Sequence, residues 1–452
     1  MKLKFINHAS YIIESQKSLL LHDPWLEGNA FNNGWSLLSK TISNQDLIDY
    51  LSNSNKHINI WISHEHSDHF SISFIKLLKK TSLNCSFFFQ KTADKRVINH
   101  LKANNFDVTE CIDGREYKLD KNFFLSVYSY AGGDSFCFVR TDQKNILNIN
   151  DCVIRSESQA MKVISRLPKN VSIDVLFTQF GYANWIGRPE DHILRKKSSE
   201  EKFIRILIQN NIFNPEIIFP FASFIYFCKE DNFYMNDEQN FPNKLRKSNA
   251  LEKIQEKINF MMPNQEVILD KDVIGNLRNK TAEAEQYWDS YEHLIKDSNY
   301  IENGLPLVSV TEGSLIEYGK KYFSGVRNHT LWLVTIFEYL KMFNLKPINL
   351  NIYDLDINLR FSYISGISKS NQDSPDISIH SSEVAFILKN EFGWNTLCVS
   401  GAFRACRDEV NSLNSFFRWQ DAIKNGFSFK NPWYSLKVSI SYFYNRLIKS
   451  YY

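Results

Sequence analysis

An alternating apolar segment, residues 57–63 (HINIWIS), leads directly into a cluster of three histidines and an aspartate. Residues two apart in an extended chain face the same side, so His64 and His66 project together at the end of this predicted strand. Asp68 and His69 follow after the chain turns, where they can face a second point nearby. Imidazole and carboxylate are suitable ligands for zinc, iron or manganese. The cluster therefore predicts a site for one or two divalent metal ions, at an edge where a buried strand ends.

Two other interpretations of the cluster are weaker. Solvated polar residues at a strand end would rarely include three histidines in a chain that has only 11. A structural zinc site usually has four protein ligands, often thiolates, and no cysteine lies near the cluster. The 7 cysteines are scattered without a CxxC pair, and the first residues do not resemble a signal peptide. These two features predict buried thiols and a cytoplasmic protein.

The composition suits a large globular protein. Of 452 residues, 43% are hydrophobic, which is enough for two domains or for one domain with additions. The 53 basic and 50 acidic residues leave a net charge of +3, so electrostatics gives no argument for nucleic acid as a partner. The apolar runs are too short to predict a transmembrane segment. We therefore expect a small-molecule substrate.

The order of predicted elements indicates an α/β layered architecture followed by an α+β extension. Over the first 180 residues short strands alternate with helices, and residues 3–25 predict a single hairpin. Charged helical segments over about 190–300 predict a helical insertion within a first domain, 1–304. A Gly/Pro break near 304–306 predicts the boundary with a C-terminal α+β region, 305–452. The basic and aromatic segment 439–452 predicts a docking helix.

The pattern H-x-H-x-D-H after an apolar strand resembles the signature of the metallo-β-lactamase superfamily, and this resemblance implies an αββα sandwich. NHASYIIE (7–14) and LHDPWLEG (21–28) resemble the branch with L-ascorbate-6-phosphate lactonase, N-acylphosphatidylethanolamine phospholipase D and CMP-N-acetylneuraminate hydroxylase. Residues 146–152, 220–227 and 380–408 are similar to the metal-binding portion of the hydroxylase family. The resemblance thus covers most of the chain in patches.

The same resemblance implies the remaining metal ligands. Asp151 would bridge two metals, and Asp134 would replace a third histidine, with a turn aspartate after two glycines as the less favoured alternative. The last histidine of many members is expected near 180–225, where this chain has only His192. Either one metal or a pair with an open face is therefore expected. The candidate ligands are His64, His66, Asp68, His69, Asp134 and Asp151, of which Asp68 and Asp151 are also candidate catalytic groups.

A second set of residues is predicted to contact substrate. His8 and His22 would line the approach to the metals in this branch, although either could be a buried histidine. Asp23 would brace a metal-bound imidazole, or it is only a turn aspartate. The complete substrate-binding set is His8, His22, Asn33, Trp35, Gln179, Tyr182 and Tyr226.

These features predict an enzyme. The first hypothesis is a hydrolase of phosphate esters, phosphodiesters or nucleotide-activated sugars, acting through a metal-bound hydroxide. The alternative is an iron-dependent oxygenase resembling CMP-N-acetylneuraminate hydroxylase. The chain has no spaced Cys and His pairs for a Rieske cluster, so this alternative requires a separate electron-transfer protein. A third hypothesis is a non-catalytic binding module.

Overall fold

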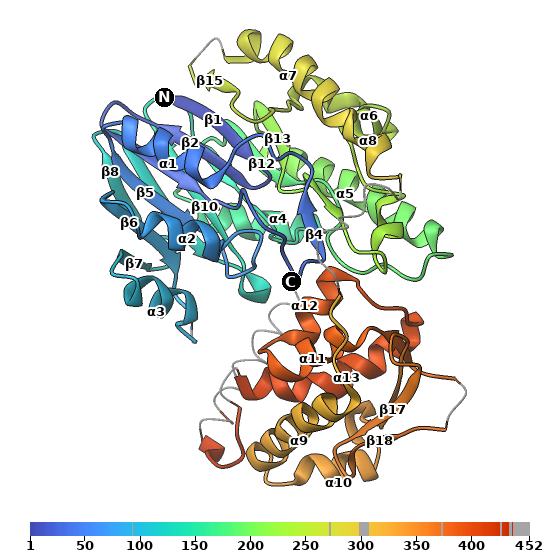
Figure 1. Ribbon diagram of the computed structural model, residues 1–452. Coiled ribbons are helices and arrows are strands. Elements are labelled where there is room, and N and C mark those ends of the chain that lie inside the picture. Colours follow the sequence, from blue (N-terminus) through green and yellow to red (C-terminus); the bar gives the residue numbers. More distant parts are fainter. Residues whose placement is uncertain are drawn as a thin grey trace.

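The computed structural model describes residues 1–92, 94–270, 273–297, 307–371, 374–424, 427–433 and 436. Two mixed β-sheets form the centre of its first part (Figure 1). The first sheet has the order β15-β1-β2-β3-β5-β6-β7. Its strands are β1 (Lys2–Asn7), β2 (Ser10–Glu14), β3 (Ser18–His22), β5 (His57–Ile62), β6 (Cys85–Gln90), β7 (Asp107–Cys111) and β15 (Glu266–Ile268).

The second sheet has the order β13-β12-β11-β10-β9-β8. It consists of β8 (Glu116–Asp120), β9 (Phe123–Ser129), β10 (Ser135–Thr141), β11 (Ile146–Asn148), β12 (Val175–Gln179) and β13 (Ile217–Phe221). Helices cover the outer face of each sheet (Figure 1). They are α1 (Asn44–Asn53), α2 (Ile72–Leu78) and α3 (Arg96–Ala103) beside the first sheet, and α4 (Glu157–Arg166) and α5 (His192–Phe213) beside the second.

The alternation of side chains in β5 explains this layering. Ile58, Ile60 and Ile62 pack in one apolar cluster with residues of α1, α2 and α3. Trp61 lies on the other face, in the cluster that also holds the second sheet. Successive strand residues face opposite sides of a sheet, so β5 contributes to two apolar layers. The result is an αββα sandwich, which confirms the expected fold class.

The N-terminal segment differs from the single hairpin predicted for it. It forms three antiparallel strands, β1, β2 and β3, because the chain also turns between Asn7 and Ser10. His8 makes this turn with a positive φ of 42°. No glycine or proline marks the position, and the turn-favouring Asn7 and Ser10 beside it are the weaker signal that residue type provides.

The segment from 190 to 300 contains the expected helices, including α5 and α7 (Val273–Asp289), but it also supplies strands to both sheets. β13 pairs with β12 in the second sheet, and β15 pairs with β1 in the first. A further strand, β14 (Ile225–Phe227), pairs with β4 (Trp35–Leu37). This segment is therefore part of the sandwich rather than only a helical insertion.

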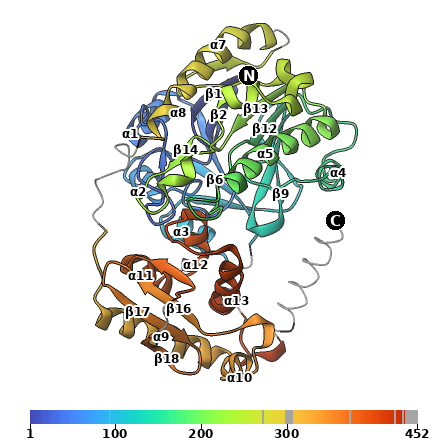
Figure 2. The same cartoon turned by 90° about the vertical axis from the view of Figure 1, so that its right-hand side faces the viewer.

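The described residues from 307 onward have their own apolar core. A small sheet has the order β18-β17-β16-β19, and helices pack around it below the sandwich (Figure 2). Its elements are α9 (Glu312–His329), α10 (Leu333–Tyr339), β16 (Ile348–Ile352), β17 (Ile357–Ser362), β18 (Gly366–Lys369), β19 (Ile377–Ile379), α11 (Ser381–Lys389), α12 (Gly393–Ser400) and α13 (Arg407–Lys424). The predicted boundary near 304 and the predicted helix at 439–452 lie outside the described residues.

Polar contacts join the C-terminal region to the sandwich. Glu383 of α11 accepts hydrogen bonds from Asn32 Nδ2, at 2.8 Å, and from Lys229 Nζ. Asn232 Nδ2 donates to the carbonyl oxygen of Ser400 at the end of α12.

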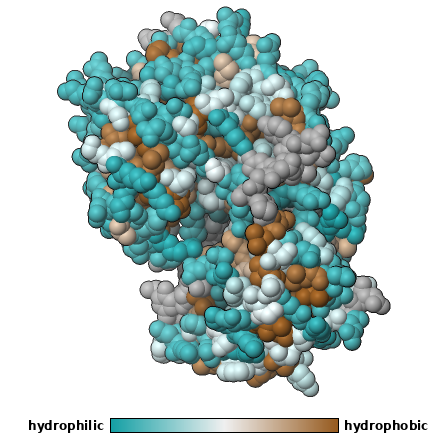
Figure 3. Space-filling model, in the orientation of Figure 1, coloured by the Kyte–Doolittle hydropathy of each residue, from teal (hydrophilic) through white to brown (hydrophobic). Residues whose placement is uncertain are grey.

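The face in Figure 3 is mostly hydrophilic with scattered apolar patches. None of the described helices combines the length and the apolar character needed to cross a membrane.

Candidate metal centre

Strand ends from both sheets meet at one edge of the sandwich. β3 and β5 run parallel in the first sheet, and β11 and β12 run parallel in the second. The carboxyl ends of these strands lead to Asp23, to the histidine cluster, to Asp151 and to Gln179. Polar residues that follow parallel strands gather at the same edge of a sheet. Segments far apart in the sequence therefore bring their side chains together here.

Two turns add side chains to this edge. His8 follows β1, and the register of β2 against β3 pairs Tyr11 with His22, so the turn lies beside the carboxyl end of β3. Asp134 precedes β10, and the register pairs Cys137 with Asn148 of β11. Both turns thus lie next to strand ends that carry the predicted ligands.

Hydrogen bonds behind His64 fix the direction of its ring. The Ser63 hydroxyl donates to Asp23 Oδ2 at 2.7 Å and lies 2.9 Å from His64 Nδ1. Because the hydroxyl donates its hydrogen bond to Asp23, the serine oxygen accepts a hydrogen bond from Nδ1–H of His64. His64 Nε2 then presents a lone pair toward the centre of the cluster.

His69 is held in the same way by Asp23. Oδ2 of Asp23 lies 3.0 Å from His69 Nδ1, and it also accepts a hydrogen bond from Asn150 Nδ2 at 2.6 Å. Histidine ligands in metal sites commonly donate their other ring N–H to a carboxylate. The structure therefore places Asp23 where it was expected as a brace, with His69 as the imidazole that it holds.

The first group of candidate ligands surrounds His64 Nε2. His66 Nδ1 lies 2.8 Å from this atom, Asp151 Oδ2 lies 3.9 Å from it, and Asp134 Oδ1 lies 4.0 Å from it. His64 is buried, whereas His66 is exposed and the two carboxylates are half-buried. The group is therefore open on the side of His66.

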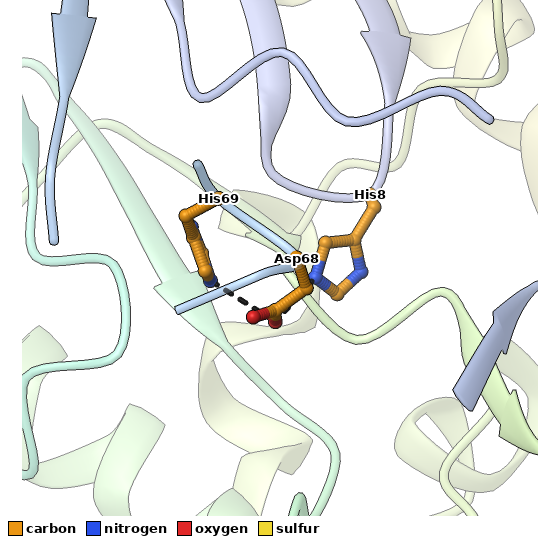
Figure 4. Close-up of side chains that lie close together, drawn as sticks. All are labelled: His8, Asp68 and His69. Carbon is orange, nitrogen blue, oxygen red and sulfur yellow. Dashed lines mark ion pairs between the residues drawn. The ribbon is translucent and has the colours of Figure 1, made fainter. Parts of the chain in front are cut away.

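The second group surrounds His69 Nε2. Asp68 Oδ2 lies 3.2 Å from this atom, and Asp151 Oδ2 lies 3.4 Å from it. His8 approaches Asp68 from the other side, with Nε2 at 3.4 Å from Oδ2 (Figure 4). Because the same oxygen of Asp151 lies close to both His64 and His69, it is shared between the two groups.

The described residues fit a pair of divalent metals. Ligand atoms at about 2.0–2.2 Å from one tetrahedral metal lie about 3.3–3.6 Å apart, and the spacings above run from 2.8 to 4.0 Å. Among the described residues, His8 Nε2, His69 Nε2 and Asp68 Oδ1 are buried and have no hydrogen-bond partner. Buried polar groups of this kind are costly unless something satisfies them, and a coordinated cation would do so.

The charges of the cluster also favour a cation. Burial lowers the pKa of His64 well below 6.5, and the neighbouring His69 and His66 lower it further. Burial acts in the same direction on His69, but Asp68, Asp151 and Asp23 outweigh it and raise the pKa of His69 well above 6.5. Three carboxylates therefore favour positive charge at the point where the second group converges.

Gln179 connects the shared carboxylate to a buried lysine of α5. Lys202 Nζ donates to Gln179 Oε1 at 2.7 Å, and Gln179 Nε2 donates to Asp151 Oδ1 at 3.3 Å. The lysine thereby fixes which end of the amide faces Asp151. Burial lowers the pKa of Lys202 to about 7.

Several residues predicted to contact substrate lie elsewhere. His22 is fully buried behind the cluster and stacks on Tyr11 with ring centroids 4.0 Å apart. Three aromatic residues of this set are buried core residues, because their large rings pack against strand neighbours: Trp35, Tyr182 and Tyr226. Asn33 lines a surface groove with Glu27 and Lys40.

Sequence reasoning missed three polar residues of the site. Ser63 and Asn150 sit directly beside predicted ligands, so adjacency in the sequence was an available signal. Lys202 gave no signal, since a lysine in a charged helix is usually solvated. Its burial depends on how α5 packs on the second sheet.

The αββα layers and the histidine-rich edge are those that the resemblance to metallo-β-lactamase-fold proteins implies. No protein-family model matches the chain. It is 24% identical over 437 residues to the inactive cytidine monophosphate-N-acetylneuraminic acid hydroxylase of Homo sapiens, covering 90% of this chain and 82% of that protein. The cytidine monophosphate-N-acetylneuraminic acid hydroxylase of Pan troglodytes is also 24% identical, with 90% and 70% covered. These matches confirm the resemblance to the hydroxylase family.

Among solved structures, a mutant of CmlA beta-hydroxylase is similar with a TM-score of 0.41 and 14% identity. The similarity covers 59% of this chain and 54% of that one. The isothiocyanate hydrolase from Delia radicum gut bacteria is similar with a TM-score of 0.39 and 14% identity, over 60% of this chain and 100% of that one.

Proposed function

We propose that this chain is a metal-dependent oxygenase that hydroxylates a nucleotide-activated sugar with electrons from a separate donor protein. The observation that carries the proposal is the extent of the similarity to the hydroxylases, which covers 90% of the chain. That share must include much of the C-terminal region as well as the sandwich. A similarity confined to the metal-binding edge would support only a general metal site.

The proposed ligands suit iron. Two histidines, His64 and His66, together with a carboxylate and open positions form the type of site that non-haem Fe(II) oxygenases use. Asp134 supplies that carboxylate, and Asp151 is shared with Asp68 and His69. When bound, the metal would supply the redox chemistry that activates dioxygen. The overall reaction converts C–H to C–OH, consumes one O2, two electrons and two protons, and releases water.

The protein's own side chains position this centre. Asp23 and Ser63 hold two imidazole rings from behind, and Gln179 orients Asp151. Phe31 packs edge-on against the exposed His66 with ring centroids 5.5 Å apart, and its backbone N–H donates to Ser67 Oγ. Asn32, the next residue, is bonded to Glu383. The C-terminal region thus holds the loop that borders the open side of the first group.

Oxygen consumption tests this proposal. The iron-reconstituted protein, supplied with a CMP-linked sialic acid and a reduced ferredoxin with its reductase, should consume oxygen in step with a hydroxylated product identified by mass spectrometry. His64→Ala should abolish both signals without loss of the fold. Iron loading without substrate-dependent oxygen uptake across CMP-, UDP- and GDP-linked sugars would count against the oxygenase.

A second candidate, a hydrolase, is favoured by the sharing of Asp151 Oδ2 between two ligand groups. A pair of metals can clamp a phosphoryl oxygen and lower the pKa of water. Phosphodiesters and nucleotide sugars should then be cleaved anaerobically by the zinc- or manganese-loaded protein. Cleavage without oxygen or reductant would replace the oxygenase proposal, and its absence would remove the hydrolase.

A further inference from the structure

We infer that His8 is a metal ligand, and that it completes the second metal position with Asp68, His69 and the shared Asp151. This inference rests on the proposed metal centre and extends it. It assigns a ligand from the first turn of the chain to a position for which the expected region, 180–225, offers only His192, which is exposed.

The geometry around Asp68 carries the inference. His8 Nε2 and His69 Nε2 lie 3.4 and 3.2 Å from the same carboxylate oxygen. One ligand atom from each of the three residues can be chosen so that all lie within 4.8 Å of one another. Figure 4 shows the His8 ring and the His69 ring on either side of the Asp68 carboxylate. Two imidazoles and a carboxylate that converge in this way match the donor set of zinc or iron.

The burial of His8 makes a merely structural role costly. Its residue exposure is 1%, Nδ1 has no hydrogen-bond partner among the described residues, and Nε2 lies 3.4 Å from Asp68 Oδ2. A structural buried histidine normally has at least one such partner, often a backbone group. The polar partner within reach of Nε2 is Asp68, which is itself a proposed ligand.

The backbone around His8 holds the ring in this direction. The residue adopts a positive φ of 42°, a conformation that is uncommon for a residue other than glycine and is often found at functional sites. Its N–H donates to Asn7 Oδ1 at 2.9 Å, and its carbonyl accepts from Ala222 N–H at 3.0 Å. Trp25 packs edge-on against the ring at 5.4 Å. The turn is therefore fixed from several sides, and the imidazole is preorganised.

In the described part of the chain between 180 and 225, no histidine lies at the second metal position. His192 is exposed at the start of α5. The second metal position is therefore filled from the β1–β2 turn, which the register of the first sheet brings to the same edge.

Metal content provides the first test. The full-length protein, stripped and then loaded with Co(II), should hold about two equivalents, and His8→Ala should hold about one. His22→Ala removes an equally buried histidine of the same three strands and should retain both metals. Circular dichroism and thermal unfolding report whether each variant keeps the fold.

A gain of signal provides the second test. His8→Cys places a thiolate donor at the site, so the Co(II)-loaded variant should gain a sulfur-to-cobalt charge-transfer band that the wild type and His22→Cys lack. A new band together with the loss of one metal in His8→Ala supports the inference.

Failure of the proposed role of His8 and failure of the proposed metal centre would give different results. Wild-type stoichiometry and affinity in His8→Ala, with no new band in His8→Cys, would overturn the role of His8 and leave the proposed function intact. A wild-type protein that binds no metal would overturn the metal centre, and with it both proposals.

Discussion

The carboxylate of Asp23 lies 3.0 Å from Nδ1 of His69, on the side of the ring that faces away from the metal cluster. It is fully buried and also accepts from Ser63 and Asn150. Asp23→Asn would present an N–H group to donors that need an acceptor. We expect metal affinity to fall about 10- to 100-fold, measured by competition with a chromogenic chelator.

The matched control for this variant is Asp120→Asn, which changes a surface carboxylate bonded to Ser15. It should leave metal affinity unchanged. Equal affinities for Asp23→Asn and the wild type would show that the brace does not act on the metal.

The contact between Lys202 and Gln179 should tune the shared carboxylate. Lys202→Met removes the amine that donates to Gln179 Oε1, so Asp151 loses its oriented donor. We expect metal affinity to fall about tenfold, measured by isothermal titration with zinc. Lys196→Met changes an exposed lysine of the same helix and should have no effect. A Lys202→Met protein that binds zinc as tightly as the control would contradict this role.

Asp421 should give the C-terminal region a distinct pH dependence. Burial raises its pKa from 3.8 to about 6, although a hydrogen bond from Asn395 acts to lower it. A carboxyl group whose pKa is raised by folding binds more protons in the folded state, so stability falls as pH rises from about 4 to 6. Asp421→Asn should remove this slope and raise stability at pH 7 by about 1–2 kcal/mol.

Urea unfolding at a series of pH values measures this effect. Asp408→Asn, at an exposed position of the same helix, should keep the wild-type slope. A slope that persists in Asp421→Asn would assign the titration to another group.

The ion pair between Glu383 and Lys229 should stabilise the contact between the two parts of the chain. Both side chains are largely buried, and Glu383 also holds Asn32. Glu383→Ala leaves the lysine charge without its partner, so we expect a loss of about 3 kcal/mol in urea unfolding. Adding Lys229→Met should recover part of that loss. Purely additive effects of the two substitutions would show that the pair is not coupled.

The sequence predicted the part of the site that local rules determine. His64 and His66 follow β5 two residues apart, with Nε2 and Nδ1 2.8 Å from each other, and the turn after them returns Asp68 and His69. Asp151 followed from the resemblance, and the structure places it between the two groups.

The rest of the site depends on tertiary packing. The turn at His8 has no glycine or proline, and its position beside β3 follows from sheet register. Trp35 and Tyr226 were predicted to contact substrate, but β4 and β14 pair and bury both. Lys202 is buried only because α5 covers the second sheet. Such features cannot be predicted from residue type or spacing in a single sequence.

The proposed centre holds two metals, whose two ligand groups share Asp151. The most direct measurement is the metal content of the purified chain by inductively coupled plasma mass spectrometry, after anaerobic loading with Fe(II) and removal of unbound metal. We expect about two iron ions per chain and less than one in Asp151→Ala. A wild-type protein that retains no metal, or an Asp151→Ala protein that retains both ions, would contradict it.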